Sequence, residues 1–312
     1  DIAGRGLLPV PLRYYAAHTG RWGGDDKVNL QNLGRGSTIK HAILAPEGHT
    51  LINSDSSQIE ARVLAWLAEQ NDLVDAFERG EDVYQIMASA IYQKPVSDIT
   101  KEERFVGKTV VLGAGYGLGA KKFQIFMRLA GVELPLEEAE RIISAYRGTY
   151  GWIPVLWRQA GAALEAMMED KTAPLGRTGV LVVEGKKGIR LPNGLYLKYP
   201  NLRVWTKDGK SELVYDTKKG KATIPTRIYG GKVIENVCQA LARIAIGDQL
   251  LRVAKKYKVA MTVHDSVIAV VPEHESFTAF EYVEICMRIR PHWALDLPLN
   301  CETGIGKNYG GV

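Results

Sequence analysis

Apolar residues recur with two different periods along this chain, and they predict helices separated by short strands. From Ile59 to Ala76 they recur three or four positions apart, which is typical of an amphipathic helix. The same spacing predicts further helices over 82–92, from about 100, over 135–169 and over 233–257. Thr100 followed by Glu103 forms a capping box, which marks the start of the helix near 100.

The strand signals are shorter. The short strand-like segment Thr50–Asp55 predicts one strand. Between 172 and 232, Gly, Lys, Pro and Asn interrupt several β-prone runs, and Asn193-Gly and Asp208-Gly are hairpin signals. We therefore expect an antiparallel β insertion in this part of the chain.

A second hairpin is predicted near the end of the chain. Two apolar runs, 259–263 and 267–271, flank a polar turn, which places His264 and Asp265 at the tip. Helices and strands follow one another without strict alternation. This order favours an α+β fold over a doubly wound sheet.

Length and composition are those of a folded globular protein. The 312 residues suggest two domains or one large domain, and 46% are hydrophobic and 24% charged. No apolar run reaches the roughly 18 residues of a transmembrane helix, so no membrane contact is expected. Three cysteines without a CxxC pair argue against a disulfide scaffold or a zinc knuckle. The net charge of +5 permits a polyanionic partner such as nucleic acid without requiring one.

Two aspartates are candidates for metal-assisted phosphate chemistry. Asp55 ends the first predicted strand, and Asp265 lies at the hairpin tip more than 200 residues later. If both project from one sheet edge, their carboxylates can hold a pair of Mg²⁺ ions. Each aspartate taken alone is more simply explained as a turn former.

Four residues spaced four apart form a second candidate site. Arg104, Lys108, Leu112 and Tyr116 lie on one stripe if this segment is helical. Two cations one turn apart can bind a triphosphate, and the next two residues can support a base or a sugar. The alternative is a solvated basic helix face that ends in a glycine-rich cap.

The same segment also fits a dinucleotide-binding turn. A strand-like run over 110–113 precedes Gly115-x-Gly117-x-x-Ala120, and Glu133 lies roughly where a ribose-binding acid would be. This interpretation predicts a nicotinamide- or flavin-dependent oxidoreductase. The helical and antiparallel patterns that follow argue against the βαβ unit it needs.

These sites occur in the order found in the family A DNA polymerases, the bacterial DNA polymerase I type. Asp55–Arg62 resembles the first palm motif of that family, Arg104–Gly117 its fingers helix, and Val263–Asp265 its second palm motif. Thr19–Arg21 with Asn29–Asn32 resembles the segment that enters the palm, and Glu235–Gln239 the helix that reads the minor groove. The resemblance covers nearly the whole chain and is greatest to the phage members.

The resemblance implies a template-directed DNA polymerase that binds primer–template DNA and dNTPs and uses two Mg²⁺ ions, which Mn²⁺ can replace. The implied metal ligands are Asp55, Asp265 and the backbone carbonyl of Ser56. The implied catalytic residues are the two aspartates and Lys108, which could donate a proton to the departing pyrophosphate.

The remaining implied contacts fall into two sets. Glu60 would exclude a ribose hydroxyl, and Tyr116 would stack at the template base position. The dNTP contacts are Arg104, Lys108, Leu112, Tyr116, Glu60, Gln58 and Tyr84. The DNA contacts are Arg21, Asn29, Gln31, Asn32, Gln239 and His264, of which Arg21 and Gln239 would read minor-groove acceptors.

Four departures from the family pattern concern the site and the extent of the chain. Leu112 stands where the family commonly has an aromatic residue, Ser266 where it commonly has Glu, and Tyr84 where many members have His. The proofreading exonuclease and the thumb normally precede the segment with which this sequence begins. We therefore expect palm and fingers only, with no proofreading.

The implied architecture is a palm with an antiparallel sheet and mainly helical fingers. The palm would comprise 1–65 and 230–312, and the fingers 66–229 with a β-rich insertion over 172–229. The expected location is the cytoplasm of a bacterial or phage-infected cell. An exonuclease or thumb region and other replication proteins are further possible partners. A DNA-binding fragment that no longer catalyses is the other alternative; a related RNA polymerase is disfavoured by Glu60, because its gate role has no use there.

Overall fold

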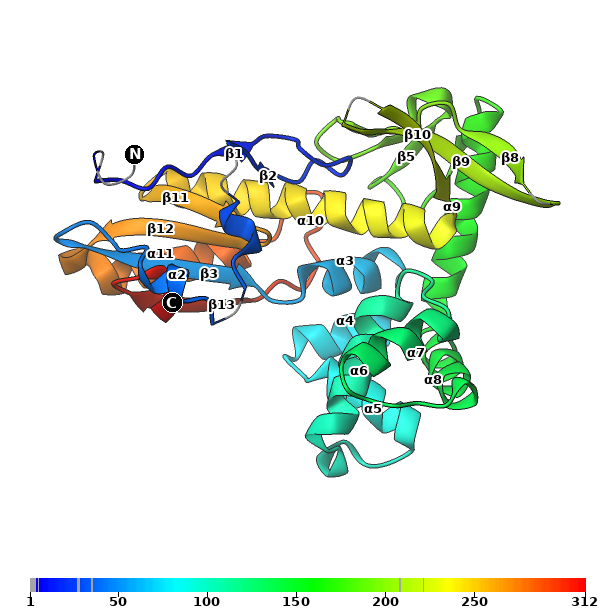
Figure 1. The fold of residues 1–312 in the computed structure, drawn as a ribbon, viewed down its shortest axis with the longest axis horizontal. Helices are drawn as coiled ribbons and strands as arrows, with labels where there is room; N and C mark the ends of the chain where they lie inside the picture. Colours follow the sequence, from blue (N-terminus) through cyan, green and yellow to red (C-terminus); the bar gives the residue numbers. More distant parts are fainter. Residues whose placement is uncertain (1–3, 5, 27–28, 35, 208, 221) are drawn as a thin grey trace. The chain divides into compact units, whose positions relative to one another are not determined.

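The computed structural model describes residues 4, 6–26, 29–34, 36–207, 209–220 and 222–312. The chain divides into two compact units. Unit 1 comprises residues 1–59 and 239–312, and unit 2 comprises residues 60–238. One boundary between the units falls inside the long helix α10 (Gly230–Ala254). Mixed helices and antiparallel sheets confirm the α+β class, and Figure 1 shows them coloured along the sequence.

Unit 1 is built on a four-stranded antiparallel sheet with the strand order β11-β12-β3-β13. Its strands are β3 (His49–Ser56), β11 (Lys258–Val263), β12 (Ser266–Pro272) and β13 (Cys301–Gly306). The predicted hairpin is confirmed, because β11 and β12 pair from Lys258↔Val270 to Val263↔Ser266. The shorter elements of this unit are β1 (Leu12–Arg13), β2 (Gly23–Gly24), η1 (Leu30–Asn32), α2 (Thr38–His41), η4 (Glu273–Glu275) and η5 (Tyr309–Gly311).

The sheet of unit 1 is covered on both faces. Alternate residues of β3 and β12 point to opposite faces. On one face, Ile52 and Val267 pack with Val253 of α10 and with α11 (Ser276–Arg288). On the other, Leu51 and Ile268 pack with Leu30, Tyr309 and other residues from the two ends of the chain. Asp55 shares the parity of Leu51, so its side chain leaves the sheet on the face that the chain ends cover.

Unit 2 begins with helices. They are α3 (Ile59–Leu67), α4 (Asn71–Glu78), α5 (Val83–Tyr92), η2 (Val96–Asp98), α6 (Lys101–Ala114), α7 (Ala120–Leu129), α8 (Leu136–Thr149) and α9 (Trp152–Met168). The capping box is confirmed: Glu103 N donates to Thr100 Oγ1 at 3.2 Å, and Thr100 N donates to Glu103 Oε2 at 3.0 Å.

Two of the long helices predicted from the sequence are interrupted. The helix expected over 59–76 breaks at Glu69, which has a positive φ of 56°. The helix expected over 135–169 breaks between α8 and α9. The buried side chain of Gln70 stabilises the second break, because its Oε1 accepts a hydrogen bond of 3.0 Å from Trp152 N. A tertiary contact of this kind satisfies a helix end in a way that periodicity does not reveal.

The predicted β insertion is confirmed and consists of two sheets. The first has the order β4-β5-β6-β7, with β4 (Thr172–Ala173), β5 (Val182–Glu184), η3 (Gly185–Lys187), β6 (Ile189–Arg190) and β7 (Tyr196–Leu197). Asn193 makes the expected turn between β6 and β7, since its Oδ1 accepts from Leu195 N at 3.1 Å.

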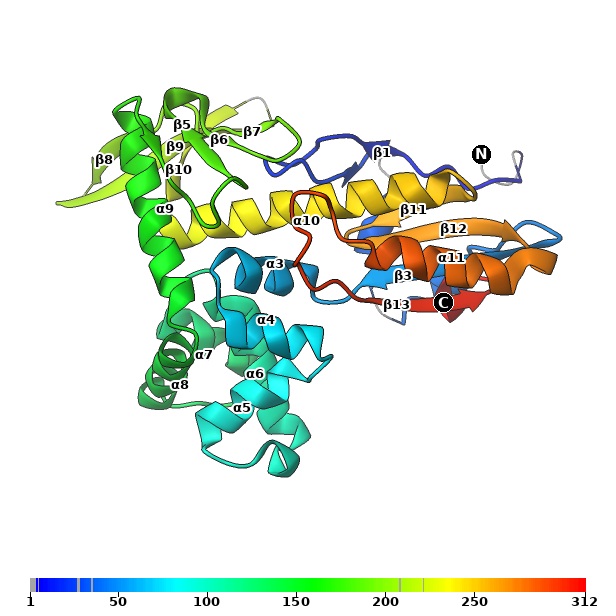
Figure 2. The same ribbon diagram turned by 180° about the vertical axis from the view of Figure 1, so that it is seen from behind.

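The second sheet is an antiparallel meander with the order β10-β9-β8, labelled in Figure 2. Its strands are β8 (Arg203–Lys207), β9 (Lys210–Lys219) and β10 (Ala222–Ile228). Asp208, the other predicted hairpin residue, lies outside the described residues. In the part of the chain that the structure describes, no helix is long and apolar enough to cross a membrane.

Candidate functional site

The register of the unit 1 sheet brings the two candidate aspartates together. Asp55 on β3 pairs directly with Ser266, the first residue of β12, so it lies beside the hairpin tip that carries Asp265. Ser56 N donates to Asp265 O at 3.1 Å, which ties the tip to the end of β3. His264 has a positive φ of 54°, which gives the chain the sharp reversal before Asp265. Backbone pairing therefore places both aspartates at the same end of the two central strands of the sheet.

The two carboxyl groups also touch each other. The side chains of Asp265 and Asp55 are hydrogen-bonded. Burial raises the pKa of Asp265, and His264, Arg21 and the hydrogen bonds to Asp55 and to its own backbone oppose that rise. Two carboxyl groups in contact need a proton or a cation between them. This donor set fits a hard divalent cation such as Mg²⁺.

Ser56 is the third predicted metal ligand. Its side chain is buried, and its Oγ has no hydrogen-bond partner among the described residues. Among those residues the side chains provide no cluster of three or more His, Cys, Asp or Glu residues that could hold a metal. Asp55 and Asp265 would therefore be the side-chain ligands of a metal at this place, and a backbone carbonyl, as predicted for Ser56, would have to add to them.

The predicted DNA-binding residues of unit 1 gather around the same hairpin. Arg21 is close enough to Asp265 to lower its pKa. Thr19 Oγ1 donates to Gln239 Oε1 at 3.4 Å, which joins the first of these segments to α10. Arg243, one turn further along α10, donates from Nε to Gly20 O at 3.0 Å and lies 5.2 Å from the ring centre of Tyr14. Residues more than 200 positions apart in the sequence thus share one surface.

The segment that contains Asn29, Gln31 and Asn32 is held in the same way. Asn29 Oδ1 accepts from Gln31 N at 3.1 Å and caps the short helix η1, whose last residue is Asn32. His264 Nε2 donates to Gln31 O at 3.1 Å. This bond joins the β11–β12 hairpin to the predicted primer–template segment.

Two residues beside Asp55 were missed by sequence reasoning. Glu302 on β13 pairs directly opposite Asp55, on the other side from Ser266. Tyr309 packs under the same face of the sheet, and burial, with a smaller contribution from the charge of Asp55, raises the pKa of its phenol. The short run 301–306 carries a weak strand signal, so its pairing with β3 could not be predicted.

In unit 2, the predicted triphosphate cations lie on one face of α6 with an aromatic ring beneath them. The Arg104 guanidinium lies 5.3 Å from the ring centre of Tyr84, and Lys108 Nζ lies 5.9 Å from it. Tyr84 is buried on α5, so its ring is a fixed support. Cations over an aromatic face are stabilised by the ring quadrupole. Three predicted dNTP contacts from two helices are therefore brought together.

Asp82 is a further member of this group that the sequence did not single out. Its Oδ2 accepts from Arg104 Nε at 2.6 Å. Its Oδ1 accepts from Tyr84 N at 3.0 Å and from Gln85 N at 3.1 Å, which caps the N-terminus of α5. One carboxylate thus begins the helix that carries Tyr84 and orients Arg104. The N-cap pattern was visible in the sequence, but the ion pair was not.

The other two residues of the predicted stripe continue along α6. Leu112 is 46% exposed, so its side chain is available to a ligand. Tyr116 follows the helix end, and its OH donates to the backbone O of Glu60 at 3.4 Å. Burial, together with the Cys238 thiol to which it is hydrogen-bonded, raises the pKa of Tyr116 well above its usual value. The phenol therefore stays protonated. Tyr116 as a whole residue is half-buried.

Glu60 and Gln58 lie at the start of α3. Glu60 is the second residue of α3 and is half-buried. Gln58 has a positive φ of 48° in the turn between β3 and α3, and it belongs to unit 1. The sharp turn at Gln58 is what directs the chain from the sheet edge into the helix.

The dinucleotide-binding alternative is wrong. It requires a strand over 110–113, and these residues belong to the helix α6. Gly115 caps that helix, and its carbonyl accepts from Trp157 Nε1 at 2.8 Å. A phosphate-binding turn between a strand and a helix does not form here.

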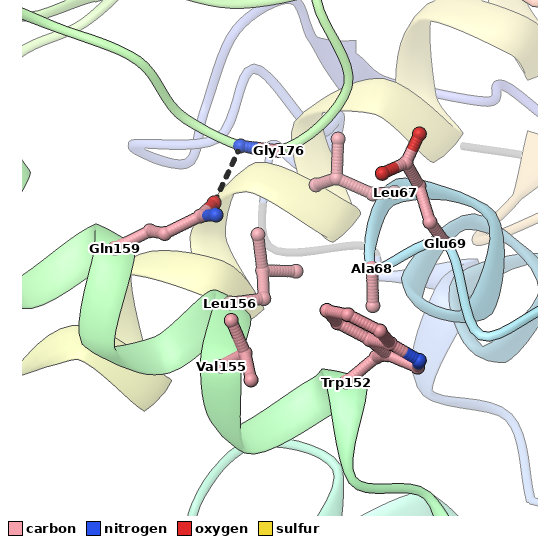
Figure 3. Close-up of a pocket in the computed structure, with 8 residues that line it drawn as sticks. All are labelled: Leu67, Ala68, Glu69, Trp152, Val155, Leu156, Gln159 and Gly176. Carbon is pink, nitrogen blue, oxygen red and sulfur yellow. Dashed lines mark hydrogen bonds between the residues drawn. The ribbon is translucent and has the colours of Figure 1, made fainter.

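Two hollows formed by described residues of unit 2 differ in size and lining. The smaller, about 60 Å³, lies between the end of α3 and the start of α9, where Gly176 N donates to Gln159 Oε1 at 3.1 Å (Figure 3). At this volume it is too small for a nucleotide. Its lining is Leu67, Ala68, Glu69, Trp152, Val155, Leu156, Gln159 and Gly176.

The larger hollow is an open groove of about 430 Å³. The guanidinium of Arg147 lies 5.7 Å from the ring of Trp157 on its wall. A Cβ on Gly231 would lie 2.6 Å from Tyr116 O, so glycine allows the backbone to pass closely at this point. Aromatic faces with arginines suit unpaired bases and phosphates. The lining is Gly117, Arg147, Pro154, Trp157, Arg158, Tyr229, Gly230 and Gly231.

Comparison with known proteins agrees with this arrangement. The sequence profile described as DNA polymerase family A matches residues 12–179, more than half of the chain. The chain is 31% identical to the DNA polymerase of Bacillus phage SP02 over 346 aligned positions, covering 98% of this chain and 52% of that protein. It is 28% identical to DNA polymerase I of Pseudomonas aeruginosa, covering 97% of this chain and 30% of that protein. The chain thus spans about half the length of the first relative and less of the second.

A solved structure has the same fold. It is described as the POL domain of Pol1 from M. smegmatis in complex with DNA primer-template and dNTP. It superposes with a TM-score of 0.70 at 20% identity, over 99% of this chain and 49% of that chain. The similarity to this solved structure concerns the fold, whereas the profile match and the sequence relatives identify the family. The chain belongs to DNA polymerase family A.

Proposed function

We propose that the chain carries out template-directed addition of dNTPs to a primer 3′-hydroxyl. The observation that carries this proposal is the contact between Asp55 and Asp265, which the sheet register brings together from distant parts of the sequence. A second set, Arg104 and Lys108 over Tyr84, has the chemistry of a triphosphate site. We propose that both sets act on one nucleotide.

Asp55 and Asp265 would hold the metal ions, with the carbonyl of Ser56 as a further ligand. Bound Mg²⁺ would supply positive charge to the reacting phosphate and favour the ionised primer hydroxyl. Backbone hydrogen bonds set the positions of the two aspartates, and the aspartates would in turn position the metal ions. His264, bonded to Gln31 O, would support the primer end.

Nucleotide binding is assigned to the face of α6. Arg104, oriented by Asp82, and Lys108 would bind the triphosphate oxygens. In the reaction the bond from the primer O3′ to the α-phosphorus forms and the bond from that phosphorus to the bridging oxygen breaks. The hydroxyl proton leaves to solvent, and Lys108 would donate a proton to the departing pyrophosphate. Leu112 and Gln58 would contact the nucleotide, and Glu60 would exclude a 2′-hydroxyl.

The remaining assignments concern DNA. Arg21 and Gln239 would read minor-groove acceptors that correct base pairs share. Asn29, Gln31 and Asn32 would contact the primer–template. Tyr116 would stack at the template base, and the groove lined by Trp157 and Arg147 supports this, because it begins next to Tyr116.

The proposed domains keep the boundaries expected from the sequence. The palm is assigned to 1–65 and 230–312, and the fingers to 66–229. Unit 1 carries the aspartates and unit 2 the cations, which supports a division of this kind. Replication in a bacterial or phage-infected cell would be the setting.

Primer extension tests the proposal. Four templates that differ only in the next base are each incubated with one dNTP at a time in Mg²⁺. The expected result is addition of the complementary nucleotide alone, its loss with a chelator, and its return with excess Mg²⁺ or with Mn²⁺. Absence of product from all four templates, with a folded chain that binds the DNA, would overturn the proposal.

A further inference from the structure

The meander β8–β10 differs from the rest of unit 2 in its exposure. Residues 204–206 and 222–225 are exposed, so both edge strands present their side chains to solvent. The meander also lies beyond residue 179, where the match to the family profile ends. None of the residues assigned to the active site above lies on the meander.

The meander holds most of the excess positive charge of the chain. Residues 203–228 contain seven Lys or Arg against three Asp or Glu. The whole chain has 40 Lys or Arg against 35 Asp or Glu, so the remainder is nearly neutral. A local excess of cations on an exposed surface raises the local concentration of a polyanion. Such a surface complements the phosphates of DNA.

The strand register places an exposed tryptophan among these cations. Paired residues project from the same face, and Trp205 pairs with Glu212 while Arg203 pairs with Val214. The same parity places Lys210 and Lys218 of β9 and Arg227 of β10 on this face. Trp205 is 41% exposed, and both lysines are exposed. We call this surface the Trp205 face; it comprises Arg203, Trp205, Lys210, Lys218 and Arg227.

The two acids on this face do not cancel the lysines. Arg203 is paired with Asp216 at 2.9 Å, and Arg227 is paired with Glu212 at 3.2 Å. Both acids are therefore neutralised by arginines that stay in place. The lysines remain as the cations that can meet phosphates.

The face is held on a fixed base. Tyr215 and Ile228, which project from the opposite face, are buried, and the rings of Tyr215 and Tyr199 pack edge to face at 5.1 Å. Asn201 Nδ2 also donates to Asp216 at 2.9 Å. A pre-organised sheet loses little conformational entropy when a ligand binds.

Protection of the edge strands explains neither the lysines nor the tryptophan, because Lys210 and Lys218 lie on β9, the central strand of the meander. Charged residues on edge strands prevent pairing with other chains. An exposed Trp on the face of the sheet adds nothing to that protection. Stacking of unpaired bases on an aromatic ring beside cations is how single-stranded DNA is bound.

We propose that the Trp205 face binds single-stranded DNA, with Trp205 stacking on a base and Lys210 and Lys218 contacting phosphates. The proposal rests on the proposed function only in the choice of DNA as the polyanion. It adds a contact that the assigned active-site residues do not provide.

Binding of a 20-residue oligothymidine, measured by fluorescence anisotropy at several salt concentrations, tests the proposal. Trp205→Ala should weaken binding roughly 5- to 150-fold, the range for one stacked base. The double change Lys210→Gln and Lys218→Gln should lower the slope of log affinity against log salt by about 1.4. Val204→Ala, on the same strand but the opposite face and 58% exposed, is the matched control and should bind like the wild type.

The outcomes separate this proposal from that of the polymerase activity. If the Trp205 and double-lysine variants unfold like the wild type and bind oligothymidine equally well, the proposal is overturned. A loss confined to blunt duplex DNA would overturn the assignment to single strands. Lys210 and Lys218 are exposed, so their replacement should leave the fold intact. The lysine variant therefore remains informative even if Trp205→Ala does not fold. Primer extension by the wild type, run in parallel, judges the polymerase proposal alone.

Discussion

The aspartates of unit 1 and the cations of unit 2 are held in place by different means. Asp55 and Asp265 are fixed by strand pairing and by the Ser56 N to Asp265 O bond, which do not involve their side chains. Arg104 is fixed by side chains, through Asp82 and the ring of Tyr84. A substitution of either aspartate should therefore remove chemistry and leave the fold. Substitutions around Arg104 and Lys108 should lower nucleotide affinity by graded amounts and not abolish the reaction.

The aspartates provide the largest expected effect. Asp55→Asn and Asp265→Asn should each lower single-turnover incorporation by at least about 10³-fold, because metal stabilisation of the transition state is worth several kcal/mol. DNA affinity should stay close to that of the wild type, since phosphate contacts elsewhere supply it. Rapid-quench incorporation and DNA titration measure the two quantities. Incorporation near the wild-type rate by either variant would remove that residue from the metal site.

Glu60 should control sugar selectivity. Glu60→Ala opens space beside the sugar C2′, so the preference for dNTP over rNTP should fall roughly 10- to 100-fold. Glu60→Gln keeps the size of the side chain and is the control that should retain most of the preference. The ratio of kcat/KM for the two nucleotides is the measurement. If the alanine variant keeps the wild-type ratio, Glu60 is not the gate.

Leu112 should leave the nucleotide sugar less firmly held than an aromatic residue would. Leu112→Phe should raise the efficiency of dNTP incorporation about 2- to 13-fold, which corresponds to an aromatic contact of roughly 0.5–1.5 kcal/mol. Leu112→Tyr should in addition improve use of chain terminators that lack the 3′-hydroxyl. Stability should change little, because the side chain is already 46% exposed. Equal dideoxy-to-deoxy ratios for Leu, Phe and Tyr would show that position 112 does not face the sugar.

Asp82 allows helix capping to be separated from the orientation of Arg104. Asp82→Asn keeps an N-cap acceptor for α5 and removes the charge opposite Arg104, so KM for the dNTP should rise about 2- to 5-fold at unchanged kcat. Asp82→Ala should show the same KM and also lower the stability by about 1 kcal/mol. Nucleotide titrations and thermal unfolding measure the pair. A KM that changes only in the alanine variant would mean that Asp82 serves the helix alone.

Local signals allowed much of this fold to be predicted from the sequence. The capping box at Thr100 and the hairpin at His264 depend on neighbouring residues, and both form as expected. The break between α8 and α9 was missed because a distant side chain, Gln70, satisfies the start of α9.

The same difference between local signals and tertiary contacts applies to the residues of the site. The aspartates and the stripe on α6 were visible as residue types at a given spacing. The Asp82–Arg104 pair depends on how α5 packs on α6, and the placement of Glu302 opposite Asp55 depends on which strand adds to β3. Such pairings are decided by tertiary packing, which a single sequence does not display.

The dependence of single-turnover incorporation on dNTP concentration tests the division between the two regions most directly. It should be measured for the wild type, Asp265→Asn and Arg104→Gln on one primer–template. We expect high dNTP concentration to return Arg104→Gln to within a few-fold of the wild-type maximal rate, while Asp265→Asn stays inactive at every concentration. Recovery of Asp265→Asn at high dNTP, or a maximal rate of Arg104→Gln as low as that of Asp265→Asn, would contradict the account.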